Sequence, residues 1–495
     1  MAQCAVRTAT LLGVQAIPVE VQVDVGAGLP TFAIVGLPDL AVQEARERVR
    51  SAVRASGFEL PNARIVVNLA PGPLRKHGTG FDLAIALGLL VATGQLPRSL
   101  AEQFAAVGEL ALDGSVRSVP GMLAYALGAR QQGLPLLGPA ESAGAACQQG
   151  VDYRPLPHLS RVRHPIPSET GQAMIGSALP VWSGLDFADV AGHDLAKRAL
   201  LIAAAGGHNA LMIGPPGSGK TMLARRLPGI LPPLDAEERL ETALVHSVAG
   251  VDESTALSGL RPFRAPHHSA SIAGLVGGGS PPRPGEASLA HNGVLFLDEM
   301  PEFGPAALQA LRQPLEDGGV TLVRADGRMH FPARFALIGS ANPCPCGFFG
   351  DTRRRCTCPD SLVDRYRGRI GGPLMDRIDL VIDVARIDPS LLLTPSNGAS
   401  SAEMRGRVLE ARERAAARGC GATSCLSGSA LLAACGLDDA ARRRLESAAR
   451  QKNLSGRGVT RLLRVARTAA DLEGSDRVRA EHVSEMLGYR AKEES

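Results

Sequence analysis

The chain has 495 residues, 45% of them hydrophobic and 21% charged, which is enough for roughly two to four domains with packed cores. No apolar run is long enough to span a bilayer, and the first residues lack the basic and then apolar order of a signal peptide, so we expect a cytoplasmic protein with no membrane partner. The net charge of +4 is too small to indicate a polyanionic partner by itself, and the 3% aromatic content disfavours base stacking as the main mode of nucleic-acid binding.

The first 155 residues alternate between strand-like and helix-like segments. The strand-like segments are 17–25, 29–35 and 64–69, and the helix-like segments are 40–56 and 81–92. This pattern predicts a mixed α/β domain over residues 1–155. The stretch 156–184 is rich in Pro, Ser and Gly and has no periodicity, so it is predicted to be a linker.

A phosphate-binding loop follows the linker. The apolar run 210–213, the sequence GPPGSGKT and a helical run give the strand, loop and helix context that the G-x-x-x-x-G-K-[ST] motif requires. Lys220 is expected to contact the β- and γ-phosphates of ATP, and Thr221 to ligate Mg²⁺. The other residues expected to bind the nucleotide are Gly214, Pro215, Pro216, Gly217, Ser218 and Gly219.

Two acidic residues end the next buried strand, which is predicted at 294–297. Ligands of an open parallel sheet bind at the carboxyl ends of its strands, so Asp298 is placed to hold the Mg²⁺ shell and Glu299 to deprotonate the attacking water. Another predicted strand ends just before Asn342, which is expected to sense the γ-phosphate. Together with the phosphate loop, these residues predict an ATPase that needs Mg²⁺.

Four cysteines stand close together after this strand. Cys344 and Cys346 form one Cys-x-Cys pair, and Cys356 and Cys358 form another. Four thiols within 15 residues of a cytoplasmic protein favour a zinc site, although the usual spacing is Cys-x₂-Cys. Free thiols or a redox pair are the alternatives.

The first domain resembles the proteolytic domain of Lon, through KHGTGFDL at 76–83 and VGELALDGSVRSVPG at 107–121. The serine position of Lon falls on or beside Gly80, next to Thr79, and its lysine position falls near Leu123. Because acyl transfer needs a nucleophile paired with a base, this resemblance implies a non-catalytic relative.

Nearly the whole chain, this Lon-like domain included, resembles the YifB/ComM family of magnesium-chelatase-like AAA+ proteins. The motifs that carry this resemblance are GPPGSGKT, FRAPHHSAS, PGEASLAHNGVLFLDE, ANPCPCG and GPLMDRIDL. The resemblance implies an α/β fold with a P-loop AAA+ core and parallel sheet at 185–390, and a helical lid at 391–495. It also implies a homo-hexameric ring that uses ATP to drive branch migration of DNA in recombination or natural transformation.

The AAA+ resemblance also implies roles for two arginines. Arg377 precedes the last core strand, where an arginine finger reaches the γ-phosphate of a neighbouring subunit, and an intrachain salt bridge to Asp376 or Asp379 is the alternative. Arg457 opens a lid helix where the second sensor belongs, with Arg461 in reserve.

The expected DNA contacts lie in two insertions of the AAA+ core. Arg324 and Arg328 flank Asp326-Gly327, a strong hairpin signal, and in a ring they are expected to grip phosphates, whereas the alternative is a solvated hairpin end. Arg264, His267 and His268 lie in a Gly- and Pro-rich segment that is expected to contact DNA or a neighbouring subunit rather than metal.

The sequence thus predicts a motor that remodels branched or single-stranded DNA. The alternatives are a subunit of a magnesium chelatase, or a AAA+ chaperone or scaffold.

Overall fold

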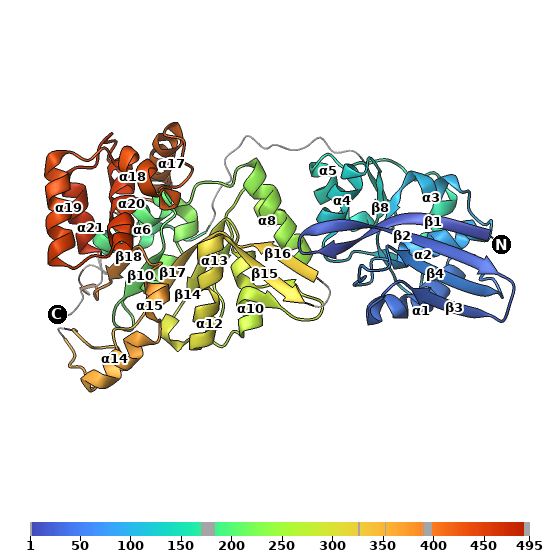
Figure 1. Ribbon diagram of the computed structural model, residues 1–495, viewed down its shortest axis with the longest axis horizontal. Coiled ribbons are helices and arrows are strands. Elements are labelled where there is room, and N and C mark those ends of the chain that lie inside the picture. Colours follow the sequence, from blue (N-terminus) through green and yellow to red (C-terminus); the bar gives the residue numbers. More distant parts are fainter. Residues whose placement is uncertain are drawn as a thin grey trace.

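The structure is a computed structural model. It describes the chain over the ranges 2–169, 184–324, 327–351, 353–388, 390 and 398–489. Within these ranges three blocks follow one another along the long axis of the molecule: an N-terminal α/β domain, a central α/β domain and a helical C-terminal domain (Figure 1). None of the described helices is both long and apolar enough to cross a bilayer.

The N-terminal domain is built on a seven-stranded sheet in the order β3-β4-β2-β1-β5-β8-β9. Its strands are β1 (Ala2–Leu12), β2 (Gln15–Gly26), β3 (Thr31–Val35), β4 (Arg64–Ala70), β5 (Ala105–Ala106), β8 (Leu136–Gly138) and β9 (Tyr153–Pro155), and a separate ribbon pairs β6 (Glu109–Leu110) with β7 (Val116–Arg117). β1 and β2 form a long antiparallel hairpin in which Ala2 lies opposite Val25 and Leu12 opposite Gln15. The domain is mixed α/β, as the sequence predicts.

Helices cover this sheet. They are α1 (Leu40–Ala55), α2 (Asp82–Ala92), α3 (Ser99–Gln103), α4 (Met122–Gln131) and α5 (Ala143–Gln148). Helix α1 begins at Asp39, whose carboxylate accepts a hydrogen bond from the backbone N–H of Val42 at 2.9 Å and so caps the helix. Every residue of α2 is buried, because this helix is apolar on all sides and can only lie inside a core.

The boundary predicted for the linker is wrong in its first half. Leu156, Leu159 and Val162 are buried in the core of the N-terminal domain, and Glu169 pairs with Tyr153 at the end of β9. The segment contains three apolar residues at a spacing of three, and a short 3₁₀ helix (Leu159–Arg163) turns the last two of them toward the core. The remainder of the predicted linker, 170–183, lies outside the described residues.

The central domain contains a parallel five-stranded sheet in the order β11-β14-β17-β10-β18. Its strands are β10 (Ala210–Ile213), β11 (Phe263–Arg264), β14 (Gly293–Leu297), β17 (Phe335–Ala341) and β18 (Leu380–Asp383). β10 lies between β17 and β18, so that Met212 is opposite both Ser340 and Ile382. This arrangement, with a phosphate loop after β10, confirms the predicted P-loop AAA+ core.

Short helices flank this sheet or extend from it. They are α6 (Asp194–Gly206), α7 (Lys220–Ala224), α12 (Pro305–Ala310), α13 (Arg312–Asp317), α14 (Asp360–Gly368) and α15 (Gly372–Met375).

Two insertions extend from the core toward the N-terminal domain. The first contains α8 (Ala236–Ala249), α9 (Ser254–Leu257), α10 (Ile272–Val276), α11 (Glu286–Leu289) and a short pair of strands, β12 (Gly277–Gly278) and β13 (Arg283–Pro284). The second is an antiparallel hairpin of β15 (Gly319–Arg324) and β16 (Gly327–Pro332). The predicted hairpin is therefore present, although Asp326 at its tip lies outside the described residues.

The C-terminal domain is helical, as predicted. Its helices are α17 (Ser401–Ala417), α18 (Gly428–Cys435), α19 (Asp439–Gln451), α20 (Gly456–Leu472) and α21 (Ala480–Gly488). One hydrophobic cluster joins these helices to α6 and to the sheet strands β10 and β18, so that lid and core share apolar packing. Arg467 is fully buried in the lid and is paired with Asp471 at 3.0 Å.

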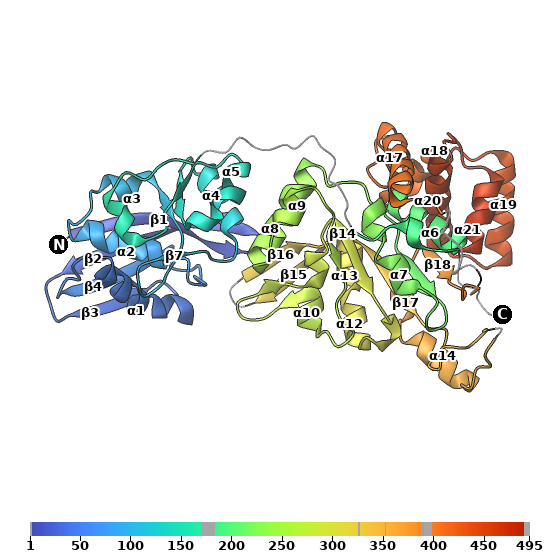
Figure 2. The same ribbon diagram turned by 180° about the vertical axis from the view of Figure 1, so that it is seen from behind.

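The N-terminal domain docks on the two insertions, as the view from behind shows (Figure 2). Leu123 of α4 is almost fully buried against apolar residues of α8 and α9, and the backbone N–H of Gly121 donates to the carbonyl of Ser247 at 2.7 Å. Gly13, in the turn between β1 and β2, lies so close to the backbone of His330 in β16 that a side chain at this position would clash. The position implied for a catalytic lysine in Lon is thus occupied here by an apolar docking contact.

Candidate functional site

The phosphate loop connects β10 to the N-terminus of α7. Gly217 and Gly219 have φ angles of 75° and 87°, a conformation that favours glycine and turns successive backbone N–H groups to one side. Lys220 Nζ donates to the carbonyl oxygens of Gly214 at 2.7 Å and Pro215 at 3.0 Å, so its ammonium group lies inside the loop. Burial lowers the pKa of Lys220, while nearby Asp298 and Glu299 act in the opposite direction.

The two acidic residues lie next to this loop, after β14. The hydroxyl of Thr221 donates to Asp298 Oδ2 at 2.8 Å, and the other oxygen of Asp298 accepts a hydrogen bond from Ser340 at the end of β17. The backbone N–H of Glu299 donates to the same serine hydroxyl at 3.0 Å, and Glu299 adopts a left-handed conformation with φ of 52°. Hydroxyl and carboxylate oxygens side by side are the donor type that Mg²⁺ prefers, so Thr221 and Asp298 fit this ion.

Asn342 completes this group of side chains. It follows β17, and its Oδ1 accepts a hydrogen bond from Lys220 Nζ at 3.2 Å. The structure therefore brings together Lys220, Thr221, Asp298, Glu299 and Asn342 at one edge of the sheet, where three parallel strands end.

Sequence reasoning missed two polar residues at this edge. Ser340 links Asp298 to Glu299, and a polar residue at the end of a buried strand was the available signal. His193 has a left-handed backbone at the start of α6, and its ring lies beside Gly219 of the phosphate loop. Burial lowers the pKa of His193, and its buried Nε2 has no hydrogen-bond partner among the described residues, which makes it available to a ligand.

The two expected arginines lie elsewhere, around a cavity of about 1670 Å³. The cavity is lined by residues that immediately precede the sheet strands, among them Asn209 before β10 and Asp379 before β18, and also by Arg377 and Arg457. Because the strands are parallel, this cavity opens at the edge of the sheet opposite to the phosphate loop. The structure does not bring Arg377 or Arg457 to the phosphate loop of their own chain.

Arg377 is held in this cavity by contacts within its own chain. Arg377 is ion-paired with Glu316 and donates to the carbonyl of Pro373 at 2.8 Å. An intrachain salt bridge, the alternative to the arginine finger, is thus present, but with Glu316 and not with Asp376 or Asp379. Burial and the neighbouring arginines lower the pKa of Arg377.

The two lid arginines differ in their contacts. Arg457 is exposed, and the described residues provide it with no hydrogen bond or ion pair. Arg461 donates to the carbonyls of Met375 and Ile378 at 3.0 and 2.8 Å, which fixes the lid to the core. Arg457 is therefore the more available of the two for a ligand outside its own chain.

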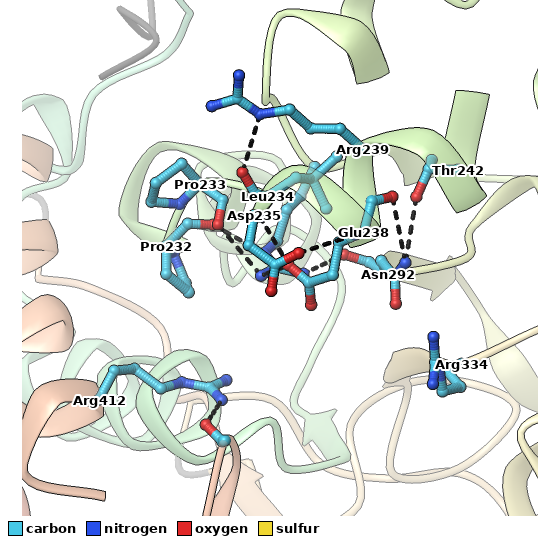
Figure 3. A network of polar contacts seen from close by, with 12 residues as sticks. Pro232, Pro233, Leu234, Asp235, Glu238, Arg239, Thr242, Asn292, Arg334 and Arg412 are labelled. Atoms are coloured by element: carbon cyan, nitrogen blue, oxygen red, sulfur yellow. Dashed lines mark hydrogen bonds and ion pairs between the residues drawn. The ribbon is translucent and has the colours of Figure 1, made fainter. Parts of the chain in front are cut away.

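The wall of the cavity near α8 is a polar network (Figure 3). Glu238 forms a capping box with Asp235 and also binds Arg261, at 2.7 Å. Arg334 joins this network through its carbonyl, which accepts a hydrogen bond from the backbone N–H of Asn292 at 2.6 Å, and through an ion pair with Glu241. Arg412 lies on the opposite side of the view, and burial lowers its pKa to about 10. The sequence analysis missed α8, although the Asp-x-x-Glu signature of its capping box was present.

The four cysteines do meet. The sulfur atoms of Cys344, Cys346, Cys356 and Cys358 all lie within 4.8 Å of one another. Four sulfurs at the zinc–thiolate distance of about 2.3 Å would be about 3.8 Å apart, and the sulfur of Cys344 lies 3.3 Å from that of Cys346 and 3.6 Å from that of Cys356. Backbone N–H groups of Thr357 and Phe348 lower the pKa of Cys346 to about 5, whereas burial and the neighbouring thiols raise the pKa values of Cys356 and Cys358 despite backbone hydrogen bonds that act in the opposite direction. The donor set therefore fits zinc.

The residues expected to contact DNA have different environments. Arg324 and Arg328 are exposed on the two strands of the hairpin, next to its tip. His267 is exposed, and its ring lies against that of His268 with the centroids 4.0 Å apart and the planes tilted by 35°. Arg264 makes a two-pronged ion pair with Glu286 at 2.7 and 2.8 Å, so its predicted contact with DNA would require this pair to open and stays a prediction.

Comparison with known proteins agrees with this architecture. Family models match in three places: the model described as magnesium chelatase, subunit ChlI, at 186–392, that of subunit ChlI of Mg-chelatase at 21–141, and that of the ChlI C-terminal region at 398–490. The magnesium-chelatase 38 kDa subunit of Rhodobacter capsulatus is 26% identical over 61% of this chain and 85% of its own length. The fold and the phosphate-loop site thus define a AAA+ protein of the magnesium-chelatase type.

Other relatives match almost the whole chain. The protein named YifB of Salmonella typhimurium is 44% identical over 99% of this chain and 97% of its own length, and the competence protein ComM of Haemophilus influenzae is 43% identical over 97% and 96%. The chain belongs to the YifB/ComM family.

Proposed function

We propose that this protein hydrolyses ATP at the phosphate loop and uses the energy to remodel branched DNA. The observation that carries this proposal is the pairing of Lys220 and Thr221 with Asp298 and Glu299 at the carboxyl ends of adjacent parallel strands. Membership of a magnesium-chelatase-like AAA+ family supports ATPase activity independently of this geometry.

Each residue of this edge has a part in the proposed hydrolysis. The backbone N–H groups of the loop and Lys220 hold the phosphates, and Lys220 exchanges its carbonyl contacts for phosphate oxygens. Thr221 and Asp298 would hold Mg²⁺, which supplies charge neutralisation at the β- and γ-phosphates when bound. Glu299 accepts a proton from the attacking water, and Asn342, in contact with Lys220, orients the γ-phosphate.

The site is completed by a second copy of the chain. Arg377 and Arg457 line the opposite edge of the sheet, so in a ring they face the phosphate loop of the neighbouring subunit. An arginine supplied in this way is worth about 10³–10⁵ in rate in other NTPases. Both arginines are therefore proposed to act in trans within a closed homo-oligomeric ring, proposed here to be a hexamer.

DNA is the proposed substrate of the motor. A relative that matches nearly the full chain is named a competence protein, which supports a role in DNA uptake and recombination. The hairpin carries Arg324 and Arg328 near its tip, and guanidinium groups on such a projection suit contact with successive backbone phosphates. Hydrolysis would move this hairpin along DNA and so drive branch migration, with His267 and His268 as further contacts.

Zinc is proposed as a third cofactor beside ATP and Mg²⁺. The four thiols converge within the distance that one ion requires, and such a site with its reduced cysteines suits the cytoplasm.

A second candidate function is the ATPase subunit of a magnesium chelatase. The specific observation in its favour is the likeness to the Rhodobacter capsulatus chelatase subunit. A AAA+ scaffold without a DNA role is a third candidate, and neither alternative predicts stimulation of hydrolysis by DNA.

The test is ATP hydrolysis by the purified protein with no DNA, with single-stranded DNA, with duplex and with a four-way junction, together with migration of that junction. We expect ATP hydrolysis to rise with single-stranded or branched DNA. We also expect the branch point to migrate until the four-way junction separates into its duplex products, without cleavage. Hydrolysis that no DNA stimulates, with an intact junction, would refute the motor in favour of the other two functions.

A further inference from the structure

The four-cysteine cluster lies directly beside the phosphate loop. Asn342, which accepts a hydrogen bond from Lys220, is separated from Cys344 only by Pro343. Cys344 is fully buried, and the turn that follows closes with a hydrogen bond of 2.9 Å from the backbone N–H of Gly347 to the carbonyl of Cys344. Two of the four thiols therefore belong to a single turn next to the loop that would hold ATP.

The far side of this turn also touches the loop. Gly347 is so close to Pro216 that a Cβ atom placed on it would lie 2.4 Å from Pro216 Cδ, a distance at which one of the two chains must shift. The turn thus meets the phosphate loop at two points, through Asn342 at Lys220 and through Gly347 at Pro216.

We propose that the cysteine cluster is a metal site that braces the phosphate loop, so that its metal content sets the affinity of the protein for ATP. The metal fixes Cys344 and Cys346 relative to Cys356 and Cys358. It thereby holds the turn from Cys344 to Gly347 against Pro216 and Lys220. Without the metal, only weak sulfur–sulfur contacts of 3.3 to 3.6 Å join Cys344, Cys346 and Cys356, and the turn is free to withdraw. The inference rests on the proposed function only in that the loop binds ATP.

The chain offers a matched pair of glycines to test the contact. Gly347 and Gly350 have similar φ angles of 83° and 78°, so alanine strains the backbone similarly at both positions. A Cβ at Gly350 meets nothing within 4 Å, whereas a Cβ at Gly347 meets Pro216. Any difference between G347A and G350A therefore reports the contact with the loop and not the backbone conformation.

The first experiment measures the binding of a fluorescent ATP analogue to the full-length variants. We expect G347A to weaken binding about tenfold or more, and G350A to change it less than about threefold. The double variant G347A/P216A removes the atoms that clash, so we expect it to bind the analogue as P216A alone does. Equal affinities of G347A and G350A, or a double variant that is no better than G347A, would overturn the brace.

The second experiment relates binding to metal. We expect about one zinc ion per chain in the wild-type protein, loss of this ion in C356S, and a matching loss of affinity for the analogue. C425S is the control, because Cys425 is exposed and lies outside the cluster. Wild-type protein without metal, or metal-free C356S that binds nucleotide normally, would overturn this inference alone, whereas wild-type protein that binds no nucleotide would overturn the proposed function itself.

Discussion

At the scale of single residues, Glu299 is the residue on which hydrolysis is expected to depend most. Its left-handed backbone and the hydrogen bond from its N–H to Ser340 hold its carboxylate at the edge where the phosphate loop opens. Replacing it by Gln keeps the shape but removes the base, so we expect E299Q to lower the rate of hydrolysis about 10²- to 10⁴-fold while nucleotide affinity is retained. Single-turnover hydrolysis and equilibrium binding measure the two effects.

Glu302 provides the control for this change, because it is also a glutamate near the site but pairs with Arg369 at 3.4 Å on the surface. E302Q is expected to hydrolyse ATP within about twofold of the wild-type rate, as exposed ion pairs contribute little. If E299Q turned over normally, the general base would have to be another group.

A second residue, His291, is expected to make stability depend on pH. Its ring is fully buried, and its Nδ1 accepts a hydrogen bond from the backbone N–H of Arg334 at 3.0 Å, so the neutral ring carries its proton on Nε2 and donates to Glu241 at 3.2 Å. Burial lowers the pKa of His291 to about 4, with Arg334 acting in the same direction. Protonation of Nδ1 would break the bond from Arg334.

The sign of the effect follows from this lowered pKa. The unfolded chain, with a histidine pKa near 6.5, binds more protons than the folded chain between about pH 6.5 and 4, so the contribution of His291 is present above pH 6.5 and is lost as the pH falls. We expect a loss of about 1–2 kcal/mol between pH 7 and 5. The pKa of Glu241 is lowered from its ordinary value of 4.5, so this carboxyl affects stability below about pH 4.5 and not between pH 7 and 5.

Thermal unfolding at pH 7, 6 and 5 checks this expectation against H291N, whose amide oxygen retains an acceptor for Arg334. Burial also lowers the pKa of His246, which faces the same region, but that group is common to both proteins. The difference in stability between wild type and H291N should therefore shrink toward pH 5. A constant difference would show that His291 does not titrate as described.

The residues that lie together at the ATP site were largely predictable, because the strand, loop and helix pattern fixes where a backbone can wrap a phosphate. Partners that are distant in sequence were not. The ion pair of Arg264 with Glu286 is an example. It joins strand β11 to the start of helix α11, and no periodicity in the sequence reveals that these two elements are neighbours. Ser340 and His193 were missed for the same reason, since their neighbours belong to other strands and loops.

At the scale of secondary-structure elements, the hairpin β15–β16 is expected to be needed for DNA-stimulated ATP hydrolysis but not for basal ATP hydrolysis. Its inner residues Met329 and Phe331 are buried against the N-terminal domain, whereas Arg324 and Arg328 are exposed, so reversing these two charges leaves the packing intact. We expect R324E/R328E to abolish stimulation of hydrolysis by DNA and to leave the basal rate within about twofold, because phosphate contacts are mainly electrostatic.

The matched control is R442E/R443E on α19, where two exposed arginines lie on the outer side of the lid. At each salt concentration tested, the control should be stimulated by DNA as much as the wild-type protein is. Equal loss of basal and stimulated hydrolysis in the hairpin variant would mean that the hairpin has a structural role instead of a DNA contact.

Elements with a clear hydrophobic periodicity were predicted at nearly their observed limits. Helix α1, for example, was expected at 40–56 and spans Leu40–Ala55. Strand β1 and helix α8 were missed. β1 begins at the second residue of the chain and has no apolar alternation as regular as that of its partner β2, with which it pairs through long-range hydrogen bonds. The segment 156–169 of the N-terminal domain was missed for a similar reason, because its apolar residues pack against core residues that are distant in sequence.

At the scale of the whole molecule, the proposed mechanism of hydrolysis uses residues from both edges of the central sheet. The residues that bind phosphate lie where the strands end, and Arg377 and Arg457 lie where they begin. The ion pair between Arg377 and Glu316 holds this arginine within its own chain, and a neighbouring triphosphate offers a stronger negative charge that would draw it across the interface. In the proposed mechanism one chain therefore carries both halves of the ATP site, but on opposite sides of its sheet.

This division predicts complementation between two inactive variants. K220A loses the lysine of the phosphate loop but retains Arg377, and R377A has the reverse defect, so each alone is expected to lose at least about 10²-fold in rate. In rings formed from equal amounts of both, about a quarter of the interfaces pair an intact loop with an intact arginine if mixing is random. We therefore expect the mixture to recover up to about a quarter of wild-type hydrolysis per subunit. A mixture as inactive as its components, in rings shown by native mass spectrometry to contain both variants, would place Arg377 outside the reaction.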